Sequence, residues 1–474
     1  MKLKLYILTG MNLISILKIG FLTVLLVSLT SCMEGRQDEP PNIIFILADD
    51  LGAGDLHCTG HPYAMTPHLD RLADRGIRFE RAYMAGAWCA PSRYGLMSGQ
   101  FPARYFDRTR NLRPEEPTIT KILKDAGYTT AHIGKWHMTS NTEKDISPRD
   151  FGIDEHFLTN FFGGGDVYTW TREERNQEYW RAKTTDAYVD RTIDFIQQNK
   201  AGGLHKPFYV NLWIYPTHSY IHPTTEQMAV YEGLTVDYSD FSPHQQEFLK
   251  FVSRHGDIDQ AMQAYCADVT AMDRALGRLF AFLESEGLND NTLVVFSSDN
   301  GPGPLATQVN NESVVERYEE KPDLLNNVGS AKIYKERKVS LHDGGIRVPF
   351  IVSWPRKISG GKVDQVSVIH GTDYLPTIAS LCGIDLPVGT YDGLDVSAAF
   401  LGENMVRDKE LYWTQAGDVA LLRDQWKAIL KSDGELLLYD IGSDPEELND
   451  LKSDHPDLAE ELKKGITDWR VNMK

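Results

Sequence analysis

Two pairs of oxygen-bearing side chains stand directly after two apolar runs of the sequence. Asp49 and Asp50 follow "NIIFILA", and Asp299 and Asn300 follow "TLVVFSS". Such runs predict buried strands of a parallel sheet, and sites in these sheets form beyond the carboxyl ends of the strands. Acids that emerge side by side there repel one another unless a cation lies between them. The oxygen ligands favour Ca²⁺ or Mg²⁺, whereas either pair alone would equally suit a loop or a helix cap.

A cysteine stands at a predicted helix entrance in "CAPSRYGLMSG", residues 89–99. Pro91 suits the first helical turn, because its missing N–H would have no partner there, and Gly99 suits the end. A helix N-terminus presents free N–H groups and partial positive charge, so it favours an anion. Cys89 is therefore predicted to lie where an anion binds.

Basic residues follow other predicted strands and could complete an anion site. Lys135 and His137 occur in "GKWH", His218 in "IYPTHSYIHP" and Lys338 in "RKVSLHDGGIRVP". Taken singly, a lysine of this kind is usually solvated and a lone histidine is usually structural. The structural interpretation is kept for the histidines at positions 68, 132, 222 and 342.

The elements that must position these residues alternate between strands and helices over most of the chain. Strands are predicted at 42–50, 129–133, 206–214, 291–301 and 348–355, and helices at 66–76, 119–125 and 258–286. Thr66 is predicted to cap the first of these helices and Gly76 to close it. The alternation favours an α/β sandwich with a mostly parallel central sheet.

The C-terminal part of the chain has a different pattern. Short strands with close turns are predicted at 410–415, 419–424, 426–432 and 435–441, followed by a helix at 453–469. This indicates a small antiparallel sheet with a helix. We therefore expect a catalytic domain at 42–395 and a C-terminal subdomain at 396–474.

The N-terminus has the features of an export signal. Lys18 precedes a short apolar run, and "LTSC" ending at Cys32 resembles a bacterial lipobox, in which the cysteine is lipidated. We expect a lipoprotein signal peptide at 1–31 and a tether at 32–41. The chain would then be an exported bacterial lipoprotein, in the periplasm or at the cell surface, held to the membrane only by its lipid.

Charge and cysteine content narrow the possible partners. The chain has 474 residues, with 49 Lys and Arg against 67 Asp and Glu, a formal charge of −18. Broad binding to nucleic acid is disfavoured, and any anion site must be locally basic. Cys58, Cys266 and Cys382 show neither a disulfide framework nor a zinc pattern, so they are interpreted as buried thiols.

In this order along the chain, the motifs resemble those of the type I sulfatases, within the alkaline phosphatase-like superfamily. The resemblance covers about residues 42–470, and its motifs are "NIIFILADDLGAGDLHCTG", "TPHLDRLADRGIRFERAY", "CAPSRYGLMSG", "GKWH", "SDNG", "DGGIRVPFIVSWP" and "LLLYDIGSDPEELNDL". It implies a sulfuric ester hydrolase. Its signature cysteine, Cys89, would be oxidised to Cα-formylglycine by a separate maturation enzyme. The hydrate of that aldehyde would attack sulfur and then release inorganic sulfate.

The resemblance also implies a role for each candidate residue. The cation, usually Ca²⁺ in this family, would be held by Asp49, Asp50, Asp299, Asn300 and the modified Cys89. Arg93 would hold the hydrated aldehyde, and Lys135 and Lys338 would neutralise the sulfate oxygens. His137 would be the base for the second hydroxyl, and His218 the acid for the leaving alkoxide.

Departures from the family pattern are small. Ala90 stands where threonine or serine is common, and "HDGG" places Asp343 where glutamate is commoner. Lys338 keeps the usual separation of five residues from that acid. The long polar tract from Pro304 to Arg337 is either a segment that shapes substrate choice or a solvated insertion.

The expected substrate is a sulfated carbohydrate, such as a fragment of a glycosaminoglycan, mucin or algal polysaccharide. Trp170, Trp180, Trp213 and Tyr220 are candidates for stacking on sugar rings, with core packing as the alternative. Two other functions stay open. One is a phosphate or phosphonate ester hydrolase of the same superfamily, and the other is a non-catalytic lipoprotein that binds sulfated glycans.

Overall fold

The computed structural model describes residues 39–104, 112–139, 146–159, 183–202, 206–219, 221–303 and 325–473. The predicted signal peptide, Cys32 and the aromatic candidates Trp170, Trp180 and Tyr220 lie outside the described residues, as do positions 304–324 of the polar tract. Within the described residues, no helix is both long and apolar enough to cross a membrane.

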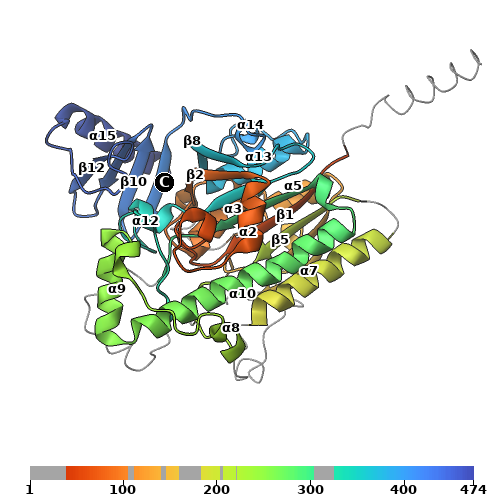
Figure 1. Cartoon of the computed structure of the whole chain (residues 1–474). Coiled ribbons are helices and arrows are strands. Elements are labelled where there is room, and N and C mark those ends of the chain that lie inside the picture. Colours follow the sequence, from red (N-terminus) through yellow and green to blue (C-terminus); the bar gives the residue numbers. More distant parts are fainter. Residues whose placement is uncertain are drawn as a thin grey trace, which may run out of the picture. The chain divides into compact units, whose positions relative to one another are not determined.

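A large mixed sheet forms the centre of the unit from Pro41 to Lys474 (Figure 1). Its eight strands run in the order β4-β3-β5-β1-β6-β7-β2-β8. Their bounds are β1 Asn42–Ala48, β2 Ile77–Tyr83, β3 Thr129–Lys135, β4 Glu155–Thr159, β5 Phe208–Trp213, β6 Thr292–Ser298, β7 Phe350–Ser353 and β8 Lys362–His370. All pairs are parallel except those of β7, which runs antiparallel to β6 and β2. The predicted mostly parallel sheet is confirmed.

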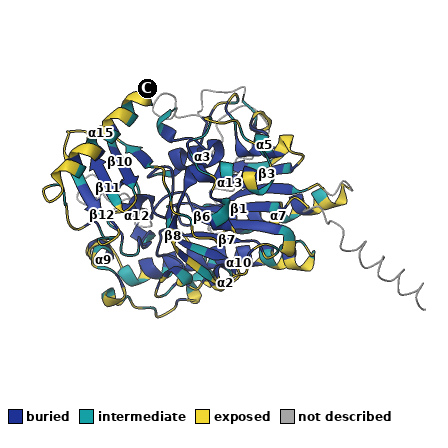
Figure 2. Cartoon of the chain, turned by 90° about the horizontal axis from the view of Figure 1, so that it is seen from above, coloured by how far each residue is buried: buried dark blue, intermediate teal, exposed yellow. Residues whose placement is uncertain are grey.

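Helices pack on both faces of this sheet. The longer helices are α2 Pro67–Asp74, α3 Cys89–Ser98, α5 Ile119–Asp125, α7 Thr184–Ala201, α9 Pro243–His255, α10 Ile258–Ser285, α13 Tyr374–Leu381 and α15 Pro456–Asn472, with the short α8 Thr225–Ala229, α12 Asp343–Ile346 and α14 Ser397–Phe400. Along β1, Ile44 and Ile46 pack with α7 and α10, whereas Ile43 and Phe45 pack with α3, α5 and α13. The strand is buried on both faces, as its continuous apolar run predicts. Figure 2 shows the buried strands in the middle, with helices on either side of them and the exposed residues toward the outside.

The N-terminus of α2 differs from the predicted cap. Thr66 occupies the N-cap position, but its hydroxyl donates to Asp70 and accepts from the His57 N–H. The free N–H groups of His68 and Leu69 are instead bonded by the carboxylate of Asp273 on α10, at 3.1 and 2.8 Å. A side chain distant in sequence therefore satisfies this helix end.

A separate antiparallel sheet follows in the C-terminal part, with the order β12-β11-β10-β9. Its strands are β9 Leu411–Gln415, β10 Asp418–Arg423, β11 Trp426–Leu430 and β12 Leu436–Asp440. Helix α15 covers one face through Leu462 and Ile466. The other face packs against Tyr83, Ala87, Leu341 and Ile346 of the preceding chain. The predicted sheet and helix are confirmed, whereas the predicted boundary at residue 396 stays a prediction.

Candidate active site

Parallel pairing of β1 and β6 brings the two oxygen-bearing pairs together. Ala48 is in register with Ser298, so Asp49 and Asp50 leave the sheet beside Asp299 and Asn300. Backbone bonds fix the junction, because Asp299 N–H donates to Ala48 O at 3.1 Å and Asp50 N–H donates to Asp299 Oδ1 at 3.2 Å. All four side chains are buried. The juxtaposition predicted from the strand ends is present.

Cys89 is the first residue of α3 and lies against the same acids. Its Sγ is 3.4 Å from Asp49 Oδ1 and 3.9 Å from Asp50 Oδ1. The turn before the helix is tight, since a Cβ on Gly86 would lie 2.6 Å from Pro91 Cγ. Gly99 ends the helix with a φ of 67°, as predicted. The helix entrance therefore presents Cys89 to the acidic cluster.

Three cations balance the three carboxylates. Lys135, the last residue of β3, places Nζ 2.5 Å from Asp49 Oδ2. Lys338 places Nζ 2.6 and 2.7 Å from the two carboxylate oxygens of Asp50, and 3.6 Å from Cys89 Sγ. Arg93 donates from Nε and Nη2 to Asp299 Oδ2, at 2.9 and 2.6 Å. The described cluster is thus a nearly closed set of buried ion pairs.

Burial and these charges set the pKa values of the acids. Burial opposes ionisation of Asp49, but Lys135, His218 and Arg93 outweigh it and hold the pKa of Asp49 well below its usual range. For Asp50, Lys338 and His218 outweigh burial in the same way and lower the pKa. Burial and the neighbouring charge of Asp49 raise the pKa of Asp299 to about 6. Asp299 is therefore harder to ionise than Asp49 or Asp50, because burial and the charge of Asp49 raise its pKa by more than Arg93 lowers it.

The donor set fits a hard divalent cation. Asp49, Asp50, Cys89 and Asp299 each offer a ligand atom, and these atoms all lie within 4.8 Å of one another. The Nδ2 group of Asn300 donates to Asp50 Oδ1 and to Gly301 O, both at 2.8 Å. Its Oδ1 is buried without a hydrogen-bond partner in the part of the chain that the structure describes. A buried oxygen of this kind is the group that a bound cation would satisfy.

The two candidate histidines lie at the edge of the cluster. His218, after β5, places Nε2 3.8 Å from Asp50 Oδ2, and its Nδ1 donates to Ser219 O at 2.7 Å. His137 follows β3 with its ring packed edge-on against Trp88, the residue before Cys89. Burial and the charge of Lys135 lower the pKa of His137 to about 3, so its imidazole is neutral at physiological pH. Among the described residues, the buried Nδ1 of His137 has no hydrogen-bond partner.

Sequence reasoning missed a buried network that supports Asp50. Thr217 Oγ1 donates to Asp50 O and bonds Tyr265 Oη, each at 3.0 Å, and Tyr265 donates to Asp55 Oδ2 at 2.5 Å. Burial raises the pKa of Asp55 to about 6. Asp55 also holds the Ser330 N–H at 2.6 Å, so it links the Asp50 loop to the segment before Lys338. The sequence signal was weak, because Tyr265 lies on a helix far along the chain.

Other sequence interpretations are settled by burial. Trp213 is fully buried, and the Arg93 guanidinium lies 5.1 Å from its ring centroid, so it belongs to the core and does not stack on a sugar. Cys58, Cys266 and Cys382 are free thiols. Cys266 is buried, and the other two are half-buried.

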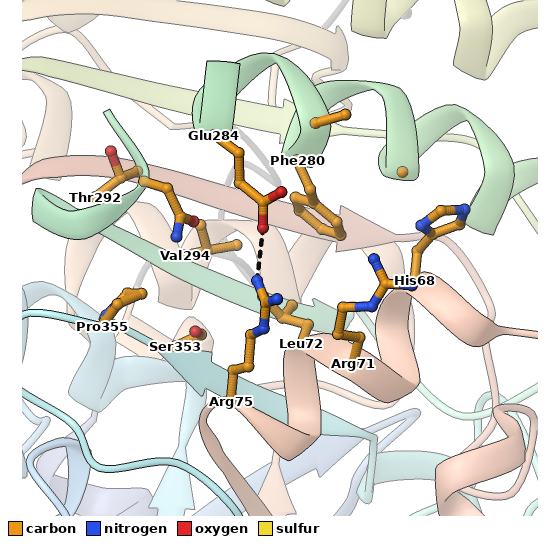
Figure 3. Close-up of a pocket in the computed structure, with 13 residues that line it drawn as sticks. His68, Arg71, Leu72, Arg75, Phe280, Glu284, Thr292, Val294, Ser353 and Pro355 are labelled. Carbon is orange, nitrogen blue, oxygen red and sulfur yellow. Dashed lines mark hydrogen bonds and ion pairs between the residues drawn. The ribbon is translucent and has the colours of Figure 1, made fainter. Parts of the chain in front are cut away.

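A separate pocket of about 90 Å³ lies between α2 and α10 (Figure 3). Arg75 Nη1 and Glu284 Oε1 meet there at 2.6 Å, and Thr292 at the start of β6 lines the wall. None of the predicted site residues lines this pocket, which is at the opposite end of β6 from Asp299. It is therefore distinct from the acidic cluster.

The family model described as Sulfatase matches residues 41–384. The chain belongs to the sulfatase family. This sulfatase is a sulfuric ester hydrolase with the alkaline phosphatase-like fold, as the motifs predicted. The matched segment contains every residue of the site described above.

Relatives and solved structures agree with this assignment. The sulfatase is 27% identical to the N-acetylgalactosamine-6-O-sulfatase of Bacteroides thetaiotaomicron, covering 92% of this chain and 95% of that protein. It is 29% identical to human arylsulfatase A, covering 79% and 70%. The crystal structure of Ps i-CgsB in complex with k-i-k-neocarrahexaose superposes with a TM-score of 0.73 at 26% identity, covering 92% and 94%.

The fold is shared more widely than the chemistry. The phosphonate monoester hydrolase of Agrobacterium radiobacter superposes with a TM-score of 0.65 at 15% identity, covering 91% of this chain and 95% of that one. Fold likeness alone therefore does not distinguish sulfate from phosphonate esters.

Proposed function

We propose that this sulfatase removes an O-sulfate group from a carbohydrate, and that N-acetylgalactosamine 6-sulfate is the first substrate to test. The observation that carries the proposal is the meeting of Cys89, three carboxylates and two lysines at the carboxyl ends of β1, β3 and β6. The choice of sugar is supported by the Bacteroides relative and by mouse and dog relatives named N-acetylgalactosamine-6-sulfatase.

Cys89 is proposed to act as formylglycine, which a separate maturation enzyme would produce. Burial and the charge of Asp49 raise the pKa of the Cys89 thiol, so the thiol is protonated at neutral pH and is a poor nucleophile. In a hydrated formylglycine, one hydroxyl oxygen would bond to sulfur as the bond between sulfur and the sugar oxygen breaks. Loss of the proton from the second hydroxyl would re-form the aldehyde and break its C–O bond to the sulfate, which leaves as inorganic sulfate. Lys338, 3.6 Å from Sγ, lies within reach of groups at this position.

Asp49, Asp50, Asp299, Asn300 and the modified Cys89 are proposed to hold Ca²⁺, with Mg²⁺ as the alternative. Such an ion would supply Lewis acidity, which polarises a sulfate oxygen and lowers the pKa of a nearby hydroxyl. Three carboxylates against Arg93, Lys135 and Lys338 give a formal charge of zero. With a divalent cation the cluster would carry a charge of +2, which suits an anionic ester.

The chain's own cations and histidines then have separate tasks. We assign to Lys135 and Lys338 the neutralisation of the sulfate oxygens, where charge develops in the transition state. His137 is neutral and can accept a proton from a hydroxyl at position 89. Because His218 Nδ1 donates to Ser219 O, Nε2 is the ring nitrogen that faces the reaction, and it can protonate the leaving sugar oxygen when the ring is an imidazolium with a proton on both nitrogens. Arg93 is bonded to Asp299 and also donates to Lys135 O at 3.0 Å. It therefore holds Asp299 and the end of β3 in place.

The experiment measures both the modification and the reaction. The protein is produced together with a formylglycine-generating enzyme. Mass spectrometry of the peptide that contains Cys89 then tests for the loss of H₂S and the gain of one oxygen. Release of inorganic sulfate is followed from N-acetylgalactosamine 6-sulfate, other sulfated sugars and an aryl sulfate, with Cys89→Ala as the inactive control.

Phosphate and phosphonate monoesters are included as the alternative substrates. If the matured protein hydrolyses these and no sulfate ester, the proposed reaction is wrong. If it binds sulfated glycans but turns over none of the esters, it is a non-catalytic binding protein. Export and lipidation at Cys32 stay proposals, which radiolabelled palmitate incorporation by wild type and Cys32→Ala would test.

A further inference from the structure

A second buried cluster of charges lies outside the active site, where the four-stranded sheet meets the larger sheet. Lys427 on β11 places Nζ 2.6 Å from Asp343 Oδ1 and 2.9 Å from Glu447 Oε1. All three side chains are fully buried. Burial opposes the charge on Lys427, yet Asp343 and Glu447 outweigh it and raise the pKa of this lysine.

The cluster of Lys427, Asp343 and Glu447 holds the N-terminus of the short helix α12 through several hydrogen bonds. Asp343, its first residue, accepts hydrogen bonds through Oδ2 from Tyr83 at 3.1 Å and from Arg347 at 3.0 Å. The Asp343 N–H donates to Glu447 Oε2 at 2.7 Å. Figures 1 and 2 both place α12 between the four-stranded sheet and the larger sheet. Lys427 and Glu447 therefore fix the start of α12 to the C-terminal sheet.

Helix α12 is tied directly to the active site. Gly344 N–H donates to Lys335 O at 2.9 Å, which closes the loop that carries Lys338. Gly301, next to Asn300, donates its N–H to Gly345 O at 2.9 Å. These contacts are close, because a Cβ on Gly301 would lie 1.8 Å from Gly344 O. A displacement of α12 would thus move both the Lys338 loop and the segment after Asn300.

The backbone of the loop is bonded to both catalytic segments. Lys338 N–H donates to Pro302 O at 3.1 Å, and Val339 N–H donates to Ala87 O at 2.7 Å. Val339 and Glu336 have positive φ values of 72° and 61°. Non-glycine residues adopt such backbone angles at a cost in energy, so the surrounding contacts must hold them.

Packing from the C-terminal sheet supports the same segments. Trp413 on β9 donates Nε1–H to Met84 O at 2.6 Å, and its sheet packs against Ala87, Leu341 and Ile346. Lys335 donates from Nζ to Glu447 O at 3.0 Å. The segment before Cys89 and the loop of Lys338 therefore share one support, which the C-terminal sheet supplies.

We propose that Lys427 and Glu447 are positioning residues for catalysis: by fixing Asp343 they hold the loop that presents Lys338 to the sulfate group. The proposal rests on the proposed function, because it assigns Lys338 to the substrate. The C-terminal sheet then contributes to catalysis indirectly, although neither Lys427 nor Glu447 contacts the reacting atoms.

The test compares Lys427→Met and Glu447→Gln with Arg407→Met. The control removes a matched buried cation, since Arg407 is paired with Asp373 and its side chain is 7% exposed. Each protein is matured, checked by mass for the same formylglycine content, and assayed for kcat and KM on N-acetylgalactosamine 6-sulfate and on an aryl sulfate. Thermal unfolding and amide hydrogen exchange of residues 334–347 are measured in parallel.

The expected result is a fall in kcat/KM of about 10- to 100-fold for Lys427→Met, since small displacements of a catalytic group cost this much. The fall is smaller for Glu447→Gln, which keeps an acceptor for the Asp343 N–H. Both variants exchange residues 334–347 faster at temperatures well below their Tm. Arg407→Met loses Tm but keeps kcat/KM within about twofold, because the Arg407 side chain bonds Asp373 and the Val368 carbonyl and none of the residues that hold the Lys338 loop.

Two results overturn different statements. If Lys427→Met and Glu447→Gln lose Tm only, with wild-type kcat/KM and wild-type exchange at 334–347, the positioning role is wrong. If wild type turns over no sulfate ester, the proposed function is wrong, and the exchange data alone decide whether Lys427 holds the loop. If Lys427→Met does not fold, the same comparison is made with Glu447→Gln, whose side chain has nearly the volume of glutamate.

Discussion

Lys135 Nζ lies 2.5 Å from Asp49 Oδ2, and both side chains are buried, with 2% and 0% exposure. Each group needs the other, because a single charge in this position would be desolvated without a partner. The pair also places an ammonium group beside Cys89, which is 3.4 Å from Asp49 Oδ1. One ion pair therefore joins the acidic cluster together and keeps an ammonium group at the proposed reaction centre.

Substitution of Lys135 by methionine should lower kcat/KM by about 100- to 1,000-fold, because a cation that neutralises transition-state charge is lost. Asp49 would remain buried without this partner, so unfolding should also become easier by about 3 kcal/mol. Steady-state kinetics and urea unfolding measure the two effects.

The control for this prediction is Lys200→Met. Lys200 is paired with Glu286 at 2.6 Å, but its side chain is 53% exposed. Exposed pairs of this kind contribute about 0–1 kcal/mol, so both activity and stability should stay near wild type. Equal losses in the two variants would show that Lys135 has no special place in the reaction.

Sequence patterns predicted the central strands and the acidic cluster for an identifiable reason. Strand β1 is buried on both faces, so its apolar run is continuous, and the acids that follow it mark its carboxyl end. Strand β8 was not predicted, because its first half, "KVDQV", is largely exposed. Strand β2 was missed because Arg78, Glu80 and Arg81 interrupt its apolar residues.

The parts of the site that were missed depend on contacts that a linear pattern does not contain. Tyr265 approaches Asp55 across 210 positions of sequence, and Lys427 approaches Asp343 across 84. A lysine that alternates along an antiparallel strand is expected to face solvent. Lys427 is buried because the C-terminal sheet docks on the rest of the chain. The residues next to Lys427 in the sequence therefore could not predict its ion pairs.

Removal of Ca²⁺ should lower the thermal stability of the protein. A ligand that binds only the native state stabilises it by about 2.7 kcal/mol at 100 times its Kd. Calorimetry after treatment with a chelator, followed by stepwise addition of Ca²⁺, should show Tm falling and then recovering. Mg²⁺ is added in a parallel series to rank the two ions.

The matched variants for this metal test are Asp50→Asn and Asp290→Asn. Asp50 is a proposed ligand, whereas Asp290 precedes the other end of β6 and its side chain is 65% exposed. Asp50→Asn should lose most of the response of Tm to Ca²⁺, and Asp290→Asn should respond like wild type. A wild-type Tm that ignores both chelator and Ca²⁺ would contradict the proposed metal site.

Acid should destabilise the protein partly through His61, which is 2% exposed. Its Nδ1 accepts hydrogen bonds from the N–H groups of Ala64 and Tyr63, at 2.9 and 3.2 Å, so this nitrogen carries no proton. Burial and the neighbouring His57 lower the pKa of His61 to about 3. The native state therefore favours the neutral ring, whereas the unfolded chain takes up a proton near the ordinary pKa.

The sign follows from proton uptake. Below about pH 6.5 the unfolded state binds a proton at His61, whereas the native state stays unprotonated there until the pH approaches 3. The contribution of His61 to stability is therefore fully present above about pH 6.5 and is lost as the pH falls toward 3. Between pH 7 and pH 5 this one group should lower the free energy of unfolding by about 2 kcal/mol. His61→Asn keeps an acceptor near the same N–H groups but does not titrate. Urea unfolding at both pH values should show a smaller loss in this variant than in wild type, and equal losses would refute the assignment.

The role of His218 should depend on the leaving group of the substrate. If Nε2 protonates the departing oxygen, His218→Ala should lower turnover of a sugar sulfate by about 100- to 10,000-fold, because an alkoxide leaves poorly without a proton. An aryl sulfate with an acidic phenol needs less help, so its turnover should fall far less.

His222→Ala is the matched control, because His222 is an exposed histidine four positions along the same segment. This variant should leave the ratio of the two rates unchanged. If His218→Ala slows both substrates by the same factor, His218 binds the sulfate group or orders Asp50, from which its Nε2 is 3.8 Å away, and another group protonates the leaving oxygen.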